Sequence, residues 1–256
     1  MYKVYKVKKK SGGHRTITEP FENLKEMLSE LKEVLDLVPL SEYAHGFVPN
    51  RSPYTNAMQH RSKAYVLNID LKDFFPSVKQ ERMMAVLRGK VSEVTLQWVE
   101  HLCFHNGELP QGSPCSPVLS NIYMIDIDEA LALISSKKGW SYTRYADDIT
   151  FSGPIELKTE KTGIIKALEA LLHPKGLRVN YRKVKLTQYS QCQRVTGIVV
   201  NNEKLTLPGK VREELFQAAL GASLSDLGPR ELGYLEYVRS VDPKFYEKLC
   251  KRMNQT

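Results

Sequence analysis

Three aspartates at two strand ends constrain this chain more than any other feature. Asp70 ends the apolar stretch 64–71, which predicts a strand that is buried on at least one face. Asp147 and Asp148 occupy the tip of a predicted β-hairpin over residues 142–152. Taken alone, the pair has a simpler interpretation as a polar turn, because aspartate favours turns. The strand-like flanks instead indicate that both acids are lifted out of a sheet.

A cluster of these acids fits the chemistry of phosphoryl transfer. Hard cations such as Mg²⁺ require grouped carboxylate oxygens, and two such ions about 4 Å apart stabilise attacking and leaving oxygens together. Asp70 and one acid of the pair are placed to bridge both ions. A protein that only retains RNA is the alternative from another class. The intact trio argues against it, because clustered carboxylates repel one another unless metals neutralise them.

The charge of the chain favours a polyanionic partner. The formal net charge is +8 and the pI about 9.2, and lysine or arginine placed on a phosphate releases condensed counterions. The four cysteines show no zinc-ligand spacing, so we expect them to be buried free thiols. No apolar stretch is long enough for a membrane span, and the N-terminus lacks a signal-peptide core. We expect a cytoplasmic protein that does not bind a membrane.

Periodicity and turn residues predict a mixed α+β fold. The expected elements are a hairpin over 1–20 with its turn at Ser11-Gly12-Gly13, helices over 21–37, 79–103, 118–135 and 159–172, a strand at 177–179, a hairpin around 201–202, and mostly helical residues from 209 onward.

Five stretches, in order, resemble the reverse transcriptase family, and specifically its bacterial retron branch. They are 8–20, 68–78, Leu109-Pro110-Gln111-Gly112, Tyr145-Ala146-Asp147-Asp148 and 176–183. The resemblance spans nearly the whole chain and implies a right-hand polymerase fold with an antiparallel palm sheet and a small helical thumb. The implied division is fingers at 1–62 and 79–108, palm at 63–78 and 109–208, and thumb at 209–256.

The resemblance also implies catalytic and metal-binding roles. Asp70, Asp147 and Asp148 would be the metal-binding carboxylates, with the carbonyl of Leu71 as a further ligand. Lys183 would protonate the pyrophosphate leaving group, because it occupies the position of the family's motif lysine. Lys185 is a close competitor for that part, and a surface lysine is the simpler interpretation of either residue.

The family's nucleotide-binding positions fall on the first hairpin, on residues 73–75 and on Gln111. Lys8 and Arg15 match the basic pair that closes on the triphosphate, although Lys9 or Lys10 can substitute for Lys8. Gln111 falls where the family supports nucleotide and template, and the alternative is an amide that stabilises its turn. Asp73, Phe74 and Phe75 complete the implied set.

Phe75 occupies the family's steric-gate position. An aromatic ring under the incoming sugar leaves no room for a 2′-hydroxyl, and this selects deoxynucleotides over ribonucleotides. Plain core packing is the alternative for Phe75. Phe74 is the better candidate for that core position.

Two further patterns resemble the retron branch in particular. Asn56-Ala57-Met58-Gln59-His60 fits its Asn-Ala-x-x-His element, and Val195-Thr196-Gly197 fits its Val-Thr-Gly triplet. The resemblance places both near RNA or primer, together with Arg239 on the basic thumb. Asn56 and His60 have an alternative role as paired hydrogen-bonding residues that fix a local loop. Gly197 is expected to permit close backbone approach.

The function implied is that of a retron-type RNA-directed DNA polymerase. Such enzymes copy part of their own structured non-coding RNA into RNA-linked single-stranded DNA, using deoxynucleoside triphosphates, and commonly serve phage defence with an accessory effector protein. A reverse transcriptase of the group II intron or abortive-infection type is the alternative. We find no ribonuclease H or endonuclease segment, so any removal of RNA is expected to depend on a host enzyme.

Overall fold

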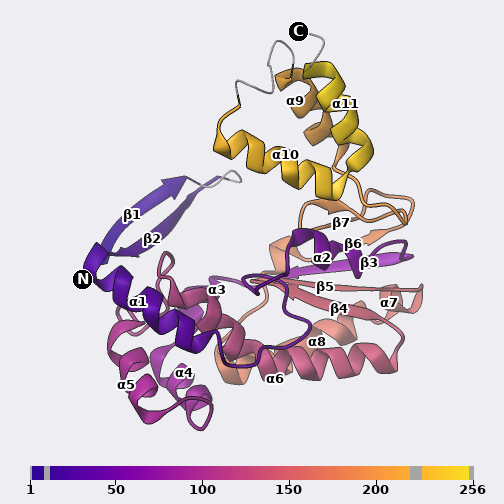
Figure 1. Ribbon diagram of the computed structural model, residues 1–256. Helices are drawn as coiled ribbons and strands as arrows, with labels where there is room; N and C mark the ends of the chain where they lie inside the picture. Colours follow the sequence, from indigo (N-terminus) through magenta and orange to yellow (C-terminus); the bar gives the residue numbers. More distant parts are fainter. Residues whose placement is uncertain (1, 9–11, 220–226, 254–256) are drawn as a thin grey trace.

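The computed structural model describes residues 2–8, 12–219 and 227–253 and has the arrangement of a right hand (Figure 1). A two-stranded hairpin and a group of helices stand on one side, a central sheet backed by helices forms the base, and three C-terminal helices stand above the sheet's other end. Lys9, Lys10 and Ser11, and the thumb positions 220–226 and 254–256, lie outside the described residues.

The fingers side combines a β-hairpin with three helices. Residues of β1 and β2 pair antiparallel in continuous register, from Tyr2 with Pro20 to Lys8 with His14. Apolar residues at helical spacing bury one face of the following helix, α1, against the main core. The bounds are β1 Tyr2–Lys8, β2 His14–Pro20, α1 Glu22–Leu35, α4 Gln80–Leu87 and α5 Glu93–Leu102.

A four-stranded antiparallel sheet in the order β4-β5-β3-β6 forms the palm, with the long helix α6 packed on one face. The central strand β3 is buried along most of its length, as the apolar stretch 64–71 predicts. The elements in and around this sheet are α2 Pro53–Met58, β3 Tyr65–Asp70, α3 Phe74–Ser77, α6 Cys115–Lys137, β4 Ser141–Tyr145, β5 Asp148–Gly153, α7 Glu156–Thr159, α8 Lys161–Leu172, η1 His173–Lys175, η2 Tyr181–Lys183 and β6 Lys185–Gln188.

A second hydrophobic core lies under the C-terminal helices and is separate from the core of fingers and palm. It joins the side chains of these helices to residues 195–207, so the small hairpin β7–β8 is the base on which the thumb stands. The bounds are β7 Arg194–Val195, β8 Ile198–Val199, α9 Gly209–Ala218, α10 Pro229–Val241 and α11 Pro243–Met253.

The α+β fold expected from the sequence is confirmed, while two local expectations are wrong. The helix expected over 79–103 is two helices, because Gly89 takes a positive φ of 77° and the Ser92 side chain caps the second one. No strand forms at 177–179 among the described residues. Only Val179 pairs there, as an isolated bridge with Leu71. No helix of the described part is long and apolar enough to cross a membrane.

Candidate active site

Sheet register brings the three aspartates together. β3 and β5 run antiparallel with Asp70 opposite Asp148, and opposed residues in such pairs have Cα atoms about 5 Å apart. The backbone N–H of Leu71 donates to the carbonyl of Asp147 at 3.0 Å, which fixes the hairpin tip against the end of β3. The acids that are distant in sequence therefore share one edge of the palm sheet.

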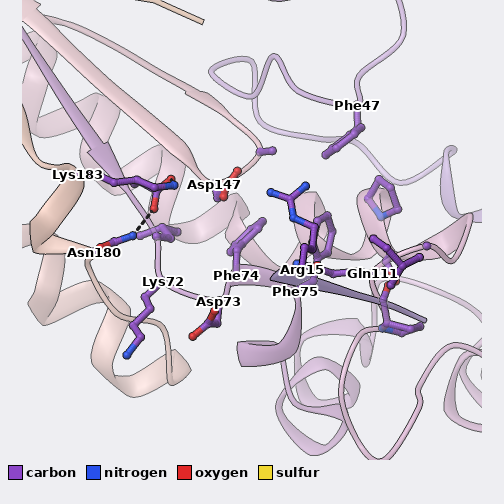
Figure 2. Close-up of a pocket in the computed structure, with 18 of the residues that line it drawn as sticks. Arg15, Phe47, Lys72, Asp73, Phe74, Phe75, Gln111, Asp147, Asn180 and Lys183 are labelled. Carbon is purple, nitrogen blue, oxygen red and sulfur yellow. Dashed lines mark hydrogen bonds and ion pairs between the residues drawn. The ribbon is translucent and has the colours of Figure 1, made fainter. Parts of the chain in front are cut away.

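Two side chains from the segment after α8 hold the Asp70 carboxylate, which is nearly buried. Lys183 Nζ donates to Oδ2 at 2.7 Å, and Asn180 Nδ2 donates to Oδ1 at 2.8 Å (Figure 2). The pKa of Lys183 is raised, first by its hydrogen bond to Asp70 and then by the negative charges of Asp70 and the other two acids. Lys183 therefore offsets part of the negative charge of this acid cluster in the protein alone.

The pKa values of the two aspartates at the hairpin tip are raised, which indicates that nearby positive charge does not fully balance them. Desolvation, followed by the charges of Asp147 and Asp70, raises the pKa of Asp148 to about 6. Desolvation and the charge of Asp70 also raise the pKa of Asp147. A cation bound between these carboxylates relieves that repulsion, and carboxylate oxygens are the ligands that Mg²⁺ prefers.

The three carboxylates fit a divalent metal in chemistry, although their side chains are not yet gathered around a common point. Among the described residues, no group of three His, Cys, Asp or Glu is close enough to hold a metal ion. Both oxygens of Asp70 accept hydrogen bonds, one from Lys183 and one from Asn180. Asp70, Asp147 and Asp148 are the residues that would hold the ions.

A cavity of about 1510 Å³ opens beside the acids, and it is lined by all six nucleotide-binding residues expected from the sequence. Lys8 and Arg15 lie almost opposite each other on the first hairpin, since Arg15 pairs with Val7. The carbonyl of Gln111 accepts from the N–H of Thr18 at 2.7 Å, which docks the turn of Gln111 onto the hairpin. Fingers and palm therefore enclose one basic pocket next to Asp147.

The two phenylalanines after Asp73 differ as the sequence predicts. Phe74 is 3% exposed and belongs to the main core, whereas Phe75 is half-buried and faces the cavity. Phe47, which the sequence did not single out, lies 6.3 Å from Phe75 between ring centroids. It is half exposed at a φ of 60°, an unusual backbone for a bulky residue. The only sequence signal was an aromatic residue between a glycine and a proline.

Asp73 lines this pocket, but its side chain points away from the space where a nucleotide is expected. Figure 2 shows the side chains of Lys72 and Asp73 directed away from Arg15 and Phe47. Asp73 has a left-handed backbone, with φ 46° and ψ 48°, at the start of α3. Its side chain is therefore not aimed at the space between Arg15 and the catalytic acids.

The two residues of the Asn-Ala-x-x-His element are enclosed by protein, and this corrects the expectation that they contact RNA. His60 is fully buried, with Nδ1 at 2.7 Å from Ser152 Oγ and Nε2 at 2.7 Å from Thr143 Oγ1. Asn56 is 1% exposed in α2. For His60, the alternative in which it fixes local structure agrees with these contacts, because the residue ties the segment after α2 to both strands of the acidic hairpin.

Burial lowers the pKa of His60 to about 3, so stability should depend on pH. A histidine whose pKa falls on folding contributes stability fully above about pH 6.5, and loses it as pH falls toward 3. We expect the free energy of unfolding to drop by as much as ~1.4 kcal/mol per pH unit in that window. Urea unfolding of wild type and His60→Gln should show a shallower slope in the variant. Equal slopes would contradict this origin.

The remaining expected RNA- or primer-binding residues lie away from the acids. Thr196 and Gly197 form the tight turn of β7–β8, with positive φ values of 47° and 82°. Val195 is buried below them. A Cβ on Gly197 would meet nothing within 4 Å, so glycine serves the turn here rather than a close protein contact. Arg239 is exposed on α10 and pairs with Glu236 at 2.6 Å.

Fold and site together define a class, the right-hand nucleic-acid polymerases. Telomerase from Candida albicans in complex with a fragment of telomeric RNA shares the fold, with a TM-score of 0.60 and 12% identity over 99% of this chain and 56% of that one. A foamy viral protease-reverse transcriptase in complex with double-stranded DNA also shares it, with a TM-score of 0.57 and 18% identity over 99% of this chain and 44% of that one. At these identities the likeness shows the fold alone.

The chain belongs to the reverse transcriptase (RNA-dependent DNA polymerase) family, whose model matches residues 7–206, and within it to the retron type. It is 34% identical to the retron Mx65 reverse transcriptase of Myxococcus xanthus, over 98% of this chain and 64% of that protein. It is 30% identical to the retron Ec86 reverse transcriptase of Escherichia coli, over 97% and 79%. The chain thus spans less than two thirds of the Mx65 relative.

Proposed function

We propose that the protein is an RNA-directed DNA polymerase that extends a primer on an RNA template. The observation that carries the proposal is the register that sets Asp70 opposite Asp148, at the edge of a cavity with Lys8 and Arg15 on its far wall. Family membership supports it. The substrates would be deoxynucleoside triphosphates. The three aspartates and the Leu71 carbonyl would hold two Mg²⁺ ions, which would supply charge stabilisation for the phosphoryl transfer.

Each side chain of the site has its own role in the proposed phosphoryl transfer. The primer hydroxyl oxygen bonds to the α-phosphorus, the bond between α- and β-phosphate breaks, and pyrophosphate leaves with the bonding electrons. The hydroxyl proton passes to solvent. Lys8 and Arg15 hold the triphosphate, Gln111 supports nucleotide and template, and Lys183 gives a proton to the pyrophosphate.

Phe75 is the residue we assign to sugar selection. Its half-buried ring lines the cavity and is supported by Phe47 and Phe74, with ring centroids at 6.3 and 5.6 Å. We expect Phe75→Ala to raise ribonucleotide incorporation relative to deoxynucleotide by about 10- to 100-fold, since the steric block is removed. Competition between the two nucleotide types during primer extension measures this ratio. Phe104→Ala, which removes a partly buried ring that packs on the core but does not line this cavity, is the control. An unchanged ratio in Phe75→Ala would move the gate elsewhere.

We further propose the retron activity itself. The protein would copy part of its own structured non-coding RNA into single-stranded DNA joined to that RNA, and the complex would act in phage defence with an accessory effector protein. Support comes from the retron relatives and from residues 56–60 and 195–197, which fit the retron patterns. The basic thumb, with Arg239 on α10, is the surface we assign to the RNA.

Purified protein offers a direct test of this retron proposal. The nucleic acid that copurifies with it should contain one defined RNA covalently joined to DNA, and a debranching enzyme should separate the two. A structured non-coding segment should lie immediately upstream of the gene. Linear products copied from arbitrary templates would instead favour an intron-type enzyme, in keeping with the 26% identity to an uncharacterised 91 kDa protein in a cob intron of Schizosaccharomyces pombe, over 76% of this chain and 25% of that protein.

A further inference from the structure

A second cavity, of about 660 Å³, adjoins the nucleotide pocket and shares Lys72 and Asp73 with it. We call it the basic side cavity. Its charged lining residues are Lys72, Asp73, Lys79, Arg82, Glu108 and Arg178. Lys79 and Glu108 are ion-paired with each other, so three cations and one carboxylate are left. Within the described part of the chain, Lys72, Arg82 and Arg178 make no ion pair.

Backbone pairing places two of these cations, Lys72 and Arg178, opposite each other. The N–H of Lys72 donates to the carbonyl of Arg178 at 2.8 Å, next to the antiparallel bridge of Leu71 with Val179. Like charges at neighbouring positions of such a pair repel each other. Both side chains are exposed and line the same cavity. The repulsion between these two side chains destabilises the protein alone, and an anion bound between them would remove that repulsion.

Arg82 reaches the same cavity from α4 by packing on a glycine. A Cβ built on Gly176 would lie 1.8 Å from Arg82 Nη1 and 2.9 Å from its Cζ, so the guanidinium occupies the space that any other residue would fill. Gly176 also has a φ of +72°, which favours glycine. The loop after α8 therefore gives the exposed Arg82 side chain its place at the wall of this cavity, which Arg178 also lines.

We propose that the basic side cavity binds the pyrophosphate released by nucleotidyl transfer before it leaves the protein. The inference rests on the proposed function and deepens it. Breaking the bond between α- and β-phosphate frees a compact, multiply charged anion in the nucleotide pocket, and Lys72 and Asp73 line both that pocket and the basic side cavity. Figure 2 shows both of these side chains directed away from Arg15. Guanidinium and ammonium groups are the donors that match phosphate oxygens, and the cavity presents three.

The test measures pyrophosphate binding directly and needs no polymerase activity. We expect Lys72→Ala/Arg178→Ala to weaken binding of inorganic pyrophosphate, measured by calorimetry on the nucleic-acid-free protein, on the order of tenfold. Inhibition of primer extension by added pyrophosphate should weaken by a similar factor. Arg88→Ala/Lys90→Ala removes the same two residue types from the exposed turn between α4 and α5, and should leave both values unchanged. Arg82→Gln is an independent variant expected to act in the same direction.

Two results would overturn the assignment. One is that both the double variant and Arg82→Gln keep the pyrophosphate affinity and the product inhibition of the wild type. The other is weakened RNA binding with unchanged pyrophosphate affinity, which would give the cavity to the RNA backbone. A protein that binds pyrophosphate through these residues but never extends a primer would count against the proposed function instead. The thermal unfolding midpoint confirms that each exposed substitution leaves the fold intact.

Discussion

Asp147→Asn/Asp148→Asn is expected to lower the rate of primer extension by about 10³-fold or more. A metal ion contributes several kcal/mol of charge stabilisation to such a reaction, and each ~1.4 kcal/mol is a factor of ten in rate. Both substitutions keep the shape of the side chain and remove a charge. Primer extension with Mg²⁺ and deoxynucleotides measures the rate.

Stability should not fall in the same double variant, and this separates loss of chemistry from loss of folding. The acids have raised pKa values because desolvation and mutual repulsion disfavour their charged forms, so neutral amides relieve a strain of the native state. Stabilisation of the wild type by added Mn²⁺ should disappear in the variant. Asp36→Asn, at the end of α1 and away from the cavity, is the matched control. Extension at the wild-type rate in the double variant would place the active site elsewhere.

Arg144→Met is expected to destabilise the protein by about 3–5 kcal/mol, because it leaves a buried carboxylate without its partner. Arg144 and Asp128 are both fully buried. The guanidinium donates from Nε to Oδ1 of Asp128 at 2.8 Å and from Nη2 to Oδ2 at 2.6 Å. Its Nη1 also donates to the carbonyl of Ala146 at 3.0 Å. Urea unfolding measures the loss.

The same network holds the acidic hairpin, so activity should fall with stability. Ala146 has a φ of 56° and directly precedes Asp147, and the Arg144 bond fixes its carbonyl. Arg144→Met/Asp128→Leu should recover much of the stability without recovering activity, since it leaves no unpaired charge. Lys138→Met removes an exposed pair with Glu160 at a similar distance, 2.7 Å, and should cost less than ~1 kcal/mol. Equal losses in Arg144→Met and Lys138→Met would contradict this account.

Local patterns in the chain predicted those parts of the site that depend on a few consecutive residues. The strand ending at Asp70 and the hairpin carrying Asp147 and Asp148 follow from alternation, apolar runs and turn residues. The basic hairpin follows likewise, because Lys8 and Arg15 flank a glycine-rich turn. Such patterns missed the break at Gly89, since one glycine is tolerated within a helical period.

The roles of polar residues in the interior could not be predicted in this way. His60 and Asn56 fit a retron pattern that suggested contact with RNA, yet both are buried, because burial depends on which distant strands cover a segment. The pairing of Arg144 with Asp128 was also not predicted. These residues lie on β4 and α6, and only their packing removes both from water.

The sequence by itself determined which residues can carry the chemistry, because carboxylates after apolar strands and a basic hairpin are properties of local pattern and residue type. Only the tertiary structure decided which of these residues lie together and which partners they contact. It set Asp70 opposite Asp148, directed Lys183 onto Asp70 and brought Lys72 beside Arg178. These outcomes depend on strand register and on contacts between residues far apart in the chain, which no local pattern encodes.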